Sequence, residues 1–103
     1  MVTRGEVWWY EPPEAKARPH LILTRSEVIP LLSDLLAVPA TRTVRGIPTE
    51  VPLDQADGMP AECVLTADNI SLVQSGFLTR PITALSAARM DDVCDAIRIA
   101  TGC

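Results

Sequence analysis

Two short segments of the sequence carry the side chains best suited to chemistry on an anion. Arg18 precedes a proline and an aliphatic run, and residues 41–46 (TRTVRG) hold two threonines and two arginines directly after another apolar run. An arginine guanidinium keeps its charge and makes paired hydrogen bonds to phosphate oxygens, while a threonine hydroxyl can hydrogen-bond the same oxygens. These residue types are equally compatible with phosphate binding and with a solvated arginine loop.

Several other kinds of chemistry lack the residues that they need. The chain has no glycine-rich phosphate loop and no Gly-x-Ser-x-Gly sequence. His20 is the only histidine, which excludes a mechanism with two imidazoles and leaves His20 as readily a packed strand residue as a catalytic one. Cys63, Cys94 and Cys103 form no Cys-x-x-Cys pair, so neither a zinc site nor a disulfide framework is predicted. We therefore expect a protein without a metal or a cofactor.

The size and charge of the chain limit its possible partners. Its 103 residues predict one domain over residues 1–103. The net charge of −4 argues against nucleic-acid binding by bulk charge. Residues 1–50 carry six basic and six acidic side chains, whereas residues 51–103 carry three and seven, so an anionic ligand is expected on the first half. No apolar run is long enough to span a membrane and the first residues do not resemble a signal peptide, so we expect a cytoplasmic protein that does not bind membranes.

Hydrophobic patterning predicts a mainly β protein. Short apolar or β-branched runs bounded by proline, glycine or aspartate are typical of strands, and they occupy residues 6–10, 18–24, 35–40, 63–67 and 77–82. Within the first run, at least one of Trp8 and Trp9 is expected to anchor the core rather than to form a base-stacking platform. Ser26 can cap a single helical turn, which Pro30 keeps short. Pro39 cannot donate to a ladder and therefore predicts a sheet edge or a bulge.

The last segment changes to a helical period. Apolar side chains recur at helical spacing after Ser86, at Met90, Val93, Cys94, Ile97 and Ala100. Ser86 is a suitable N-cap, and Gly102 stands where a C-terminal cap glycine belongs. Five or six strands and one terminal helix, in a chain of this length, predict a small antiparallel barrel covered by that helix.

Four stretches, in this order, resemble the MazF/PemK (Kid) family of bacterial toxins. They are residues 4–8 (RGEVW), 18–23 (RPHLIL), 38–51 (VPATRTVRGIPTEV) and 63–70 (CVLTADNI), and with the terminal helix the resemblance covers nearly the whole chain. It implies a small SH3-like antiparallel barrel with a C-terminal α-helix that works as a homodimer. It also implies the toxin of a type II toxin–antitoxin pair, a sequence-specific, metal-independent endoribonuclease for single-stranded RNA. In that family the ribose 2′-hydroxyl attacks the adjacent phosphate, leaving 2′,3′-cyclic phosphate and 5′-hydroxyl ends, and the cleavage inhibits translation and growth.

The resemblance also implies roles for individual residues. The family's arginine before proline falls on Arg18, which would stabilise charge on the phosphate in the transition state. The family's threonine falls on Thr41, which would hydrogen-bond the same group. Glu14 is a candidate for removing the 2′-hydroxyl proton, although a solvated loop carboxylate is the simpler explanation. The residues expected to contact RNA are Glu14, Lys16, Arg42, Arg45 and Asn69.

Two departures from the family concern the proposed RNA surface. The loop at residues 11–17 is shorter than in many relatives and has no glycine, which leaves open whether it acts as a lid. The negative net charge predicts a local basic groove with salt-sensitive binding rather than tight nonspecific binding. The same groove, flanked by apolar strands, would accept an acidic and hydrophobic antitoxin tail that folds on binding.

Three other functions fit the sequence less well than the ribonuclease does. A gyrase-poisoning toxin of the CcdB type shares the barrel and the dimer but uses an aromatic residue near the C-terminus, and no aromatic residue follows Phe77 here. A catalytically inert homologue that only binds an antitoxin is disfavoured by the presence of both Arg18 and Thr41. A generic nucleic-acid-binding barrel would interleave aromatic and basic residues beyond the first strand, and this chain does not.

Overall fold

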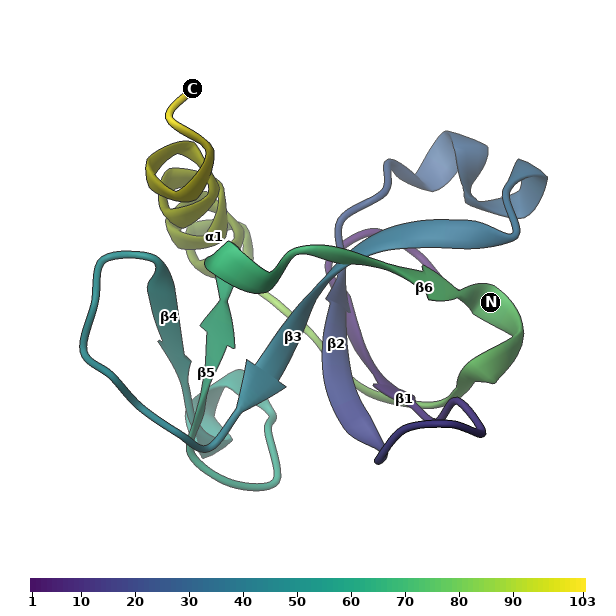
Figure 1. Ribbon diagram of the computed structural model, residues 1–103, viewed down its shortest axis with the longest axis horizontal. Coiled ribbons are helices and arrows are strands. Elements are labelled where there is room, and N and C mark those ends of the chain that lie inside the picture. Colours follow the sequence, from purple (N-terminus) through teal and green to yellow (C-terminus); the bar gives the residue numbers. More distant parts are fainter.

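The computed structural model describes residues 1–103 and contains seven strands and one long helix (Figure 1). The strands are β1 (Glu6–Tyr10), β2 (Arg18–Ile22), β3 (Asp34–Thr41), β4 (Glu50–Leu53), β5 (Cys63–Thr66), β6 (Ser71–Gln74) and β7 (Leu78–Ala84), and the helix is α1 (Ala87–Thr101). Four 3₁₀ turns lie between strands, namely η1 (Ser26–Leu31), η2 (Gln55–Asp57), η3 (Ala67–Asn69) and η4 (Ser75–Phe77). The predicted class, mainly β with a terminal helix, is confirmed. None of the helices is both long and apolar enough to cross a membrane.

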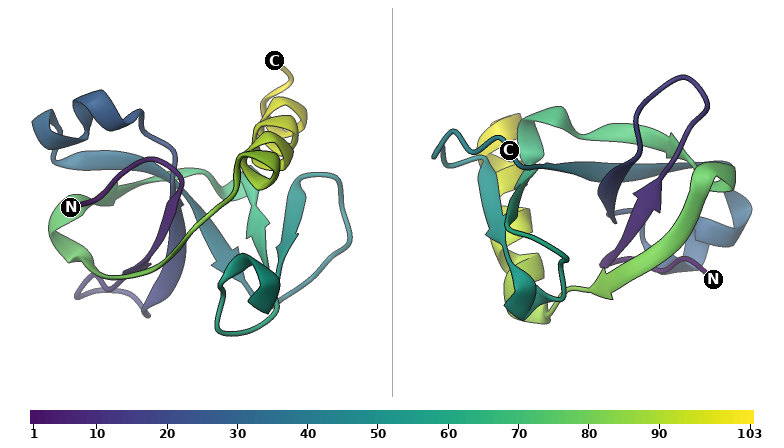
Figure 2. Two further views of the ribbon diagram at one scale, coloured as in Figure 1. Left: turned by 180° about the vertical axis from the view of Figure 1, so that it is seen from behind. Right: turned by 90° about the horizontal axis from the view of Figure 1, so that it is seen from below.

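All strand pairings are antiparallel, in the order β4-β5-β3-β2-β1-β7, and β6 also pairs with β3. The first strand therefore lies between β2 and the last strand. The sheet curls, but its two end strands are not hydrogen-bonded to each other, so the predicted barrel is an open one. Helix α1 covers the β4 and β5 end of the sheet, and η1 and β6 lie at the opposite end (Figure 2).

Two hydrophobic clusters form on the two faces of the curled sheet, because neighbouring side chains of a strand point to opposite faces. The larger cluster packs against α1 and includes Val7, Leu21, Val38, Leu65 and Val93. The smaller one packs against η1 and β6 and consists of Ile22, Ile29, Leu35, Ala37 and Val73. Strand β3 contributes to both clusters and so ties the two cores together.

Two strands, β4 and β6, were not predicted, because neither has a continuous apolar pattern. Pro52 lies inside β4, which tolerates a proline because β4 is at the edge of the sheet. β6 buries Val73 alone. The five strands that were predicted are present, with ends that differ by at most two residues.

The sequence predicted a sheet edge or a bulge at Pro39. Pro39 instead lies inside the central strand β3, in regular pairing with His20 of β2. On its other side β3 changes neighbour at this point, from β6, which pairs up to Ala37, to β5, which pairs from Ala40. The carbonyl oxygen of Pro39 accepts a hydrogen bond from Thr66 Oγ1 (3.4 Å). The backbone nitrogen of Pro39 lies on the same side of β3, between the stretches that pair with β6 and with β5. No strand there needs an N–H donor from residue 39, so a proline is tolerated.

Helix α1 matches its prediction at both ends. Ser86 Oγ accepts a hydrogen bond from the backbone N–H of Arg89 (3.1 Å). Gly102 follows the helix with a φ of +73°, the left-handed conformation that glycine adopts most readily. Val93 and Ala96 are its buried residues, and they place its apolar stripe on the larger core.

Candidate active site

Strands β2 and β3 bring the two chemistry-bearing segments together. Their register pairs His20 with Pro39, and the same register continued by two residues sets Arg18 across from Thr41. Both residues line an open pocket of about 460 Å³ at this end of the sheet, which we call the cationic pocket. The residues around it are Trp9, Lys16, Ala17, Arg18, Pro19, Ala40, Thr41, Arg42 and Thr43.

The cationic pocket is positively charged, although the whole chain is negative. Lys16, Arg18 and Arg42 line it, and no aspartate or glutamate does. All three cations are exposed, and none of them forms an ion pair. Their charges and the hydroxyls of Thr41 and Thr43 are therefore available to an anionic ligand.

Residues 42–46, which we call the basic loop, are held by one carboxylate. Glu50 accepts hydrogen bonds from the backbone N–H groups of Arg45 (3.0 Å) and Gly46 (2.8 Å). Thr41 Oγ1 accepts a hydrogen bond from the N–H of Thr43 (3.2 Å). These bonds hold the main chain at both ends of the basic loop.

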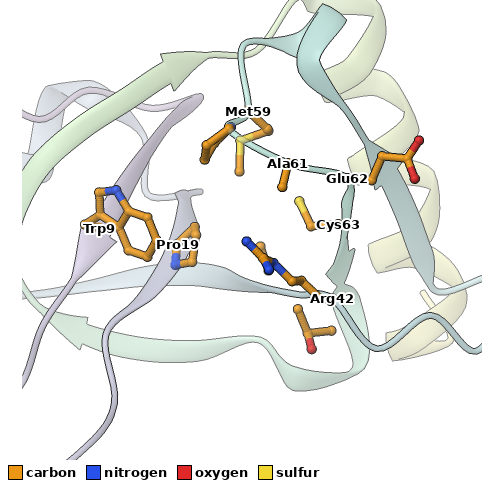
Figure 3. A pocket seen from close by; sticks show the side chains of 10 residues that line it. Trp9, Pro19, Arg42, Met59, Ala61, Glu62 and Cys63 are labelled. Carbon is orange, nitrogen blue, oxygen red and sulfur yellow. The ribbon is translucent and has the colours of Figure 1, made fainter.

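A smaller pocket of about 80 Å³ adjoins the cationic pocket, and we call it the apolar pocket (Figure 3). The two pockets share the lining residues Trp9, Pro19, Ala40, Thr41 and Arg42. Residues 59–63, which lead from η2 into the start of β5, form the other wall. Figure 3 shows the Arg42 side chain reaching into the pocket between Pro19 and Cys63, whereas the Glu62 carboxylate points away from it.

Trp9 lines both pockets and was not among the predicted site residues. It pairs with Pro19 of β2 and Arg80 of β7, and the guanidinium carbon of Arg80 lies 5.7 Å from its ring centroid. Trp8 packs on the smaller core, as expected of one tryptophan, and its Nε1–H donates to Glu6 Oε1 (3.0 Å). The alternation of a strand predicts that the two rings lie on opposite faces. The pairing of β1 with β2 decides which of the two rings meets the pocket, and the local sequence does not reveal that pairing.

His20 supports Arg18 from the protein interior. Its side chain is buried and lines neither pocket. Its Nδ1–H donates to the carbonyl oxygen of Arg18 (3.1 Å), and its ring meets that of Tyr10 edge-on at 5.1 Å. Burial lowers the pKa of His20, and the nearby charge of Arg18 lowers it further, against the opposing effect of the hydrogen bond. His20 is therefore a neutral packed residue at neutral pH.

The wall of the apolar pocket is fastened to the rest of the fold through Asp57. Its Oδ1 accepts a hydrogen bond from Arg89 Nε of α1 (3.1 Å), and its carbonyl oxygen accepts one from Thr83 Oγ1 of β7 (2.9 Å). Burial alone would raise the pKa of Asp57, but hydrogen bonds from the Asp54 backbone and from Arg89 outweigh it and hold that pKa below its ordinary value. Gly58 follows with a φ of +90° and starts the wall.

Three of the predicted RNA-contacting residues lie outside both pockets. Glu14 is exposed in the loop between β1 and β2, and Arg45 is exposed in the basic loop. Asn69 is in η3, where its Nδ2–H donates to Thr66 Oγ1 (3.5 Å). The structure thus gathers four of the seven predicted site residues in one place. It contains no group of three or more histidine, cysteine, aspartate or glutamate side chains arranged to hold a metal ion.

Comparison with known proteins gives matches along almost the whole chain. The family described as PemK-like, MazF-like toxin of type II toxin–antitoxin system matches residues 3–101. The probable endoribonuclease MazF5 of Mycobacterium tuberculosis is 36% identical over 101 residues, which cover 97% of this chain and 93% of the relative. The solved structure of M. tuberculosis toxin MazF-mt6 has a TM-score of 0.86 and 36% identity, with 94% of this chain and 96% of that chain covered. A mycobacterial endoribonuclease in complex with its cognate antitoxin has a TM-score of 0.86 and 27% identity, with 99% and 96% covered.

The family match and the MazF5 relative each cover nearly the whole chain, and the two solved structures share its fold. None of them favours a toxin of the CcdB type. This chain belongs to the PemK-like, MazF-like family of toxins of type II toxin–antitoxin systems.

Proposed function

We propose that this toxin inhibits growth by cutting single-stranded RNA at its cationic pocket. One observation carries the proposal: Lys16, Arg18, Arg42 and two threonine hydroxyls surround one pocket that no carboxylate lines. Such a pocket suits a phosphodiester, whose oxygens accept hydrogen bonds from guanidinium and hydroxyl donors. Relatives named endoribonucleases, at 36% and 27% identity, support the same activity for this chain.

The proposed reaction transfers the scissile phosphate to the 2′-hydroxyl of the same nucleotide. The 2′-oxygen forms a bond to phosphorus and the bond from phosphorus to the 5′-oxygen breaks, so the products end in a 2′,3′-cyclic phosphate and a 5′-hydroxyl. Arg18 and Thr41 donate hydrogen bonds to the non-bridging oxygens, where negative charge grows in the transition state. Glu14 is our candidate to accept the 2′-hydroxyl proton, and water protonates the leaving 5′-oxygen. The step proceeds without a metal.

The surfaces beside the pocket would contact the rest of the RNA. We assign Lys16, Arg42 and Arg45 to flanking phosphates, and Asn69 to a base edge. The antitoxin would occupy the same pocket with acidic side chains and cover the neighbouring apolar strands, as a tail that folds on binding. A structural relative of this chain is bound to its cognate antitoxin.

We also propose that the toxin is a homodimer, formed through exposed leucines at the η1 and β6 end. Leu31, Leu36 and Leu72 are 80%, 40% and 64% exposed, and they line one surface depression together with Arg25 and Asp34. A two-fold dimer places the same patch on both partners. Charges of both signs at the rim then allow Arg25 of one copy to meet Asp34 of the other.

The test is cleavage of a long single-stranded RNA by the purified protein in EDTA, with the product ends mapped. We expect discrete cuts that leave 5′-hydroxyl ends. Arg18→Ala and Thr41→Ala should each lower the cleavage rate, Arg18→Ala by about 100- to 1,000-fold, as for loss of one donor to a developing anion. Arg98→Ala is the matched control, because Arg98 is exposed on α1 and pairs with Asp95 far from the pocket.

Two results would contradict the proposal. Folded wild-type protein that cuts none of several RNAs at low salt would turn attention to an inert antitoxin-binding homologue. Cleavage that survives both pocket substitutions would place the activity elsewhere on the molecule or in a contaminant.

A further inference from the structure

Arg80 of β7 is a cation beside the cationic pocket whose charge the proposed reaction does not use. Its side chain is exposed and forms no ion pair, and its guanidinium carbon lies 5.7 Å from the centroid of the Trp9 ring. We propose that Arg80 binds a second phosphate of the RNA strand, beyond the scissile phosphate at Arg18. The proposal rests on the ribonuclease activity proposed above and adds a subsite for a neighbouring nucleotide.

The strand pairings place Arg80 on the face of the sheet that carries the cationic pocket. Trp9 pairs with Pro19 of β2 on one side and with Arg80 of β7 on the other, and directly paired residues point to the same face. Both Trp9 and Pro19 line the cationic pocket. The row from Pro19 to Arg80 crosses two interstrand spacings, about 10 Å in total. A single strand that crosses Trp9 therefore meets Arg80 with a different phosphate from the one at Arg18.

A bulge in β7 turns Arg80 toward this face. In a regular strand Leu78 and Arg80, two residues apart, would point to the same side. The register with β1 shifts between them, because Leu78 pairs with Tyr10 while Arg80 pairs with Trp9, which leaves Thr79 as the extra residue. Leu78 consequently packs on the smaller core, and Arg80 lies on the opposite face with Trp9. Bulges are frequent next to active sites, where they redirect a side chain in this way.

The hydrogen-bond donors of Arg80 are available to an anion. Its attraction to the Trp9 ring acts through the ring face and occupies no N–H group. Glu11, directly after β1, accepts a hydrogen bond from Thr79 Oγ1 and forms no ion pair with Arg80. A guanidinium keeps its charge and binds a phosphate through paired hydrogen bonds. Because phosphate contacts position a strand without reading its bases, Arg80 should affect how long an RNA the enzyme needs rather than which sequence it cuts.

The first experiment counts phosphate contacts from the salt dependence of binding. The probe is a fluorescein-labelled single-stranded 2′-O-methyl RNA, which has no 2′-hydroxyl to attack the phosphate and so is not cut. Loss of one phosphate contact should lower the slope of log affinity against log salt concentration by about 0.7. We expect this decrease for Arg80→Gln, and the wild-type slope for Arg80→Lys, which keeps the charge. Arg98→Gln is the matched control, because it removes the same charge from an exposed residue of α1 and should leave the slope unchanged. An Arg80 that only steadies Trp9 would change the affinity without changing the slope.

The second experiment varies the length of the RNA that is cut. On a long RNA, Arg80→Gln should raise the KM by about 3- to 10-fold and leave kcat within about twofold, because the phosphate that Arg80 holds does not react. The same RNA is then shortened from each end, one nucleotide at a time, until only the scissile phosphate remains. The wild type and Arg80→Gln should have equal kcat/KM once the phosphate that reaches Arg80 has been removed.

The outcomes separate this inference from the ribonuclease proposal. A smaller salt slope for Arg80→Gln supports the subsite even if no RNA is cleaved. Equal slopes for the wild type and Arg80→Gln would overturn the subsite and leave the ribonuclease standing. A defect of Arg80→Gln that persists on a substrate with only the scissile phosphate would overturn it as well. Folded wild-type protein that binds no single strand, even at low salt, would overturn both proposals.

Discussion

Gly58 is the position where a single added carbon should destabilise this toxin most clearly. Its φ is +90°, and a Cβ built on it would lie 2.8 Å from the Cβ of Thr83 and closer still to Thr83 Oγ1. That hydroxyl is the one that donates to the carbonyl oxygen of Asp57 (2.9 Å). Gly58→Ala therefore forces a left-handed alanine, a steric overlap and the loss of a hydrogen bond at the same time.

A second glycine allows the cost of the left-handed backbone to be separated from the cost of the steric overlap. Gly46 also has a positive φ, +71°, but a Cβ there would meet nothing within 4 Å. Gly46→Ala should therefore cost only the left-handed backbone, about 1–2 kcal/mol of unfolding free energy. Gly58→Ala should cost about 2 kcal/mol more, from the overlap and the lost hydrogen bond. The effect of alanine on the unfolded chain is the same in both variants and cancels in the difference.

The assay is urea denaturation at one fixed protein concentration, because the stability of the proposed dimer would depend on concentration. The difference of about 2 kcal/mol between Gly58→Ala and Gly46→Ala corresponds to about 10 °C in melting temperature, at about 4–8 °C per kcal/mol for a domain of this size. Thr83→Ala should recover part of the loss in a Gly58→Ala background, since it removes the hydroxyl that the new Cβ meets. Equal unfolding free energies for Gly58→Ala and Gly46→Ala, within about 0.5 kcal/mol, would refute the steric reasoning.

Three further predictions concern charges and hydrogen bonds around the pockets. Asp57→Asn should lower the unfolding free energy at pH 7 by about 1–2 kcal/mol, since Asp57 is nearly buried against Arg89. The pKa of Asp57 is depressed in the folded state, so its contribution to the unfolding free energy is present above about pH 4 and is lost as the pH falls through the folded pKa. The unfolding free energies of the wild type and Asp57→Asn should therefore converge in acid. His20→Asn, which keeps a donor near the Nδ1 position, should retain more cleavage activity than His20→Ala; equal rates for the two variants would show that the hydrogen bond to the carbonyl oxygen of Arg18 does not position Arg18. Because burial lowers the pKa of His20, the wild type should begin to lose stability below about pH 6.5 as the imidazole is forced to ionise, and this part of the acid loss should be missing from both variants. Glu50→Gln should raise the KM for RNA by about 3- to 10-fold with little change in kcat, because the neutral amide holds the basic loop less firmly; an unchanged KM would contradict this role.

The part of the site that could be predicted is the part built from neighbouring strands. Arg18 and Thr41 lie on β2 and β3, which pair with each other and are separated only by η1, so their motifs and order along the chain sufficed to expect them together. Prediction also succeeded for α1, whose period and caps are local features. The roles of these residues in cleavage stay predictions until the variants are assayed.

The part that could not be predicted depends on contacts between distant segments. The apolar pocket needs residues 59–63, which are placed by the pairing of β5 with β3 and by the ion pair of Asp57 with Arg89. Neither contact leaves a periodic or motif signal in the sequence. For the same reason the sequence did not show which of the two tryptophans would meet the pocket. Pro39 was expected at an edge or a bulge, although a change of neighbouring strand accommodates it equally well.

The pairing of β1 with β7 joins two segments that leave the ribosome at very different times. The chain emerges from the ribosome with its N-terminus first, so β1 waits for residues 78–84 before it gains its second neighbour. Trp9 meets Arg80 only then. Strands β2 and β3, which are closer in sequence, can pair earlier because the loop between them is short. A nascent chain therefore carries Arg18 and Thr41 long before Trp9, which lines both pockets, has its second neighbouring strand and its contact with Arg80.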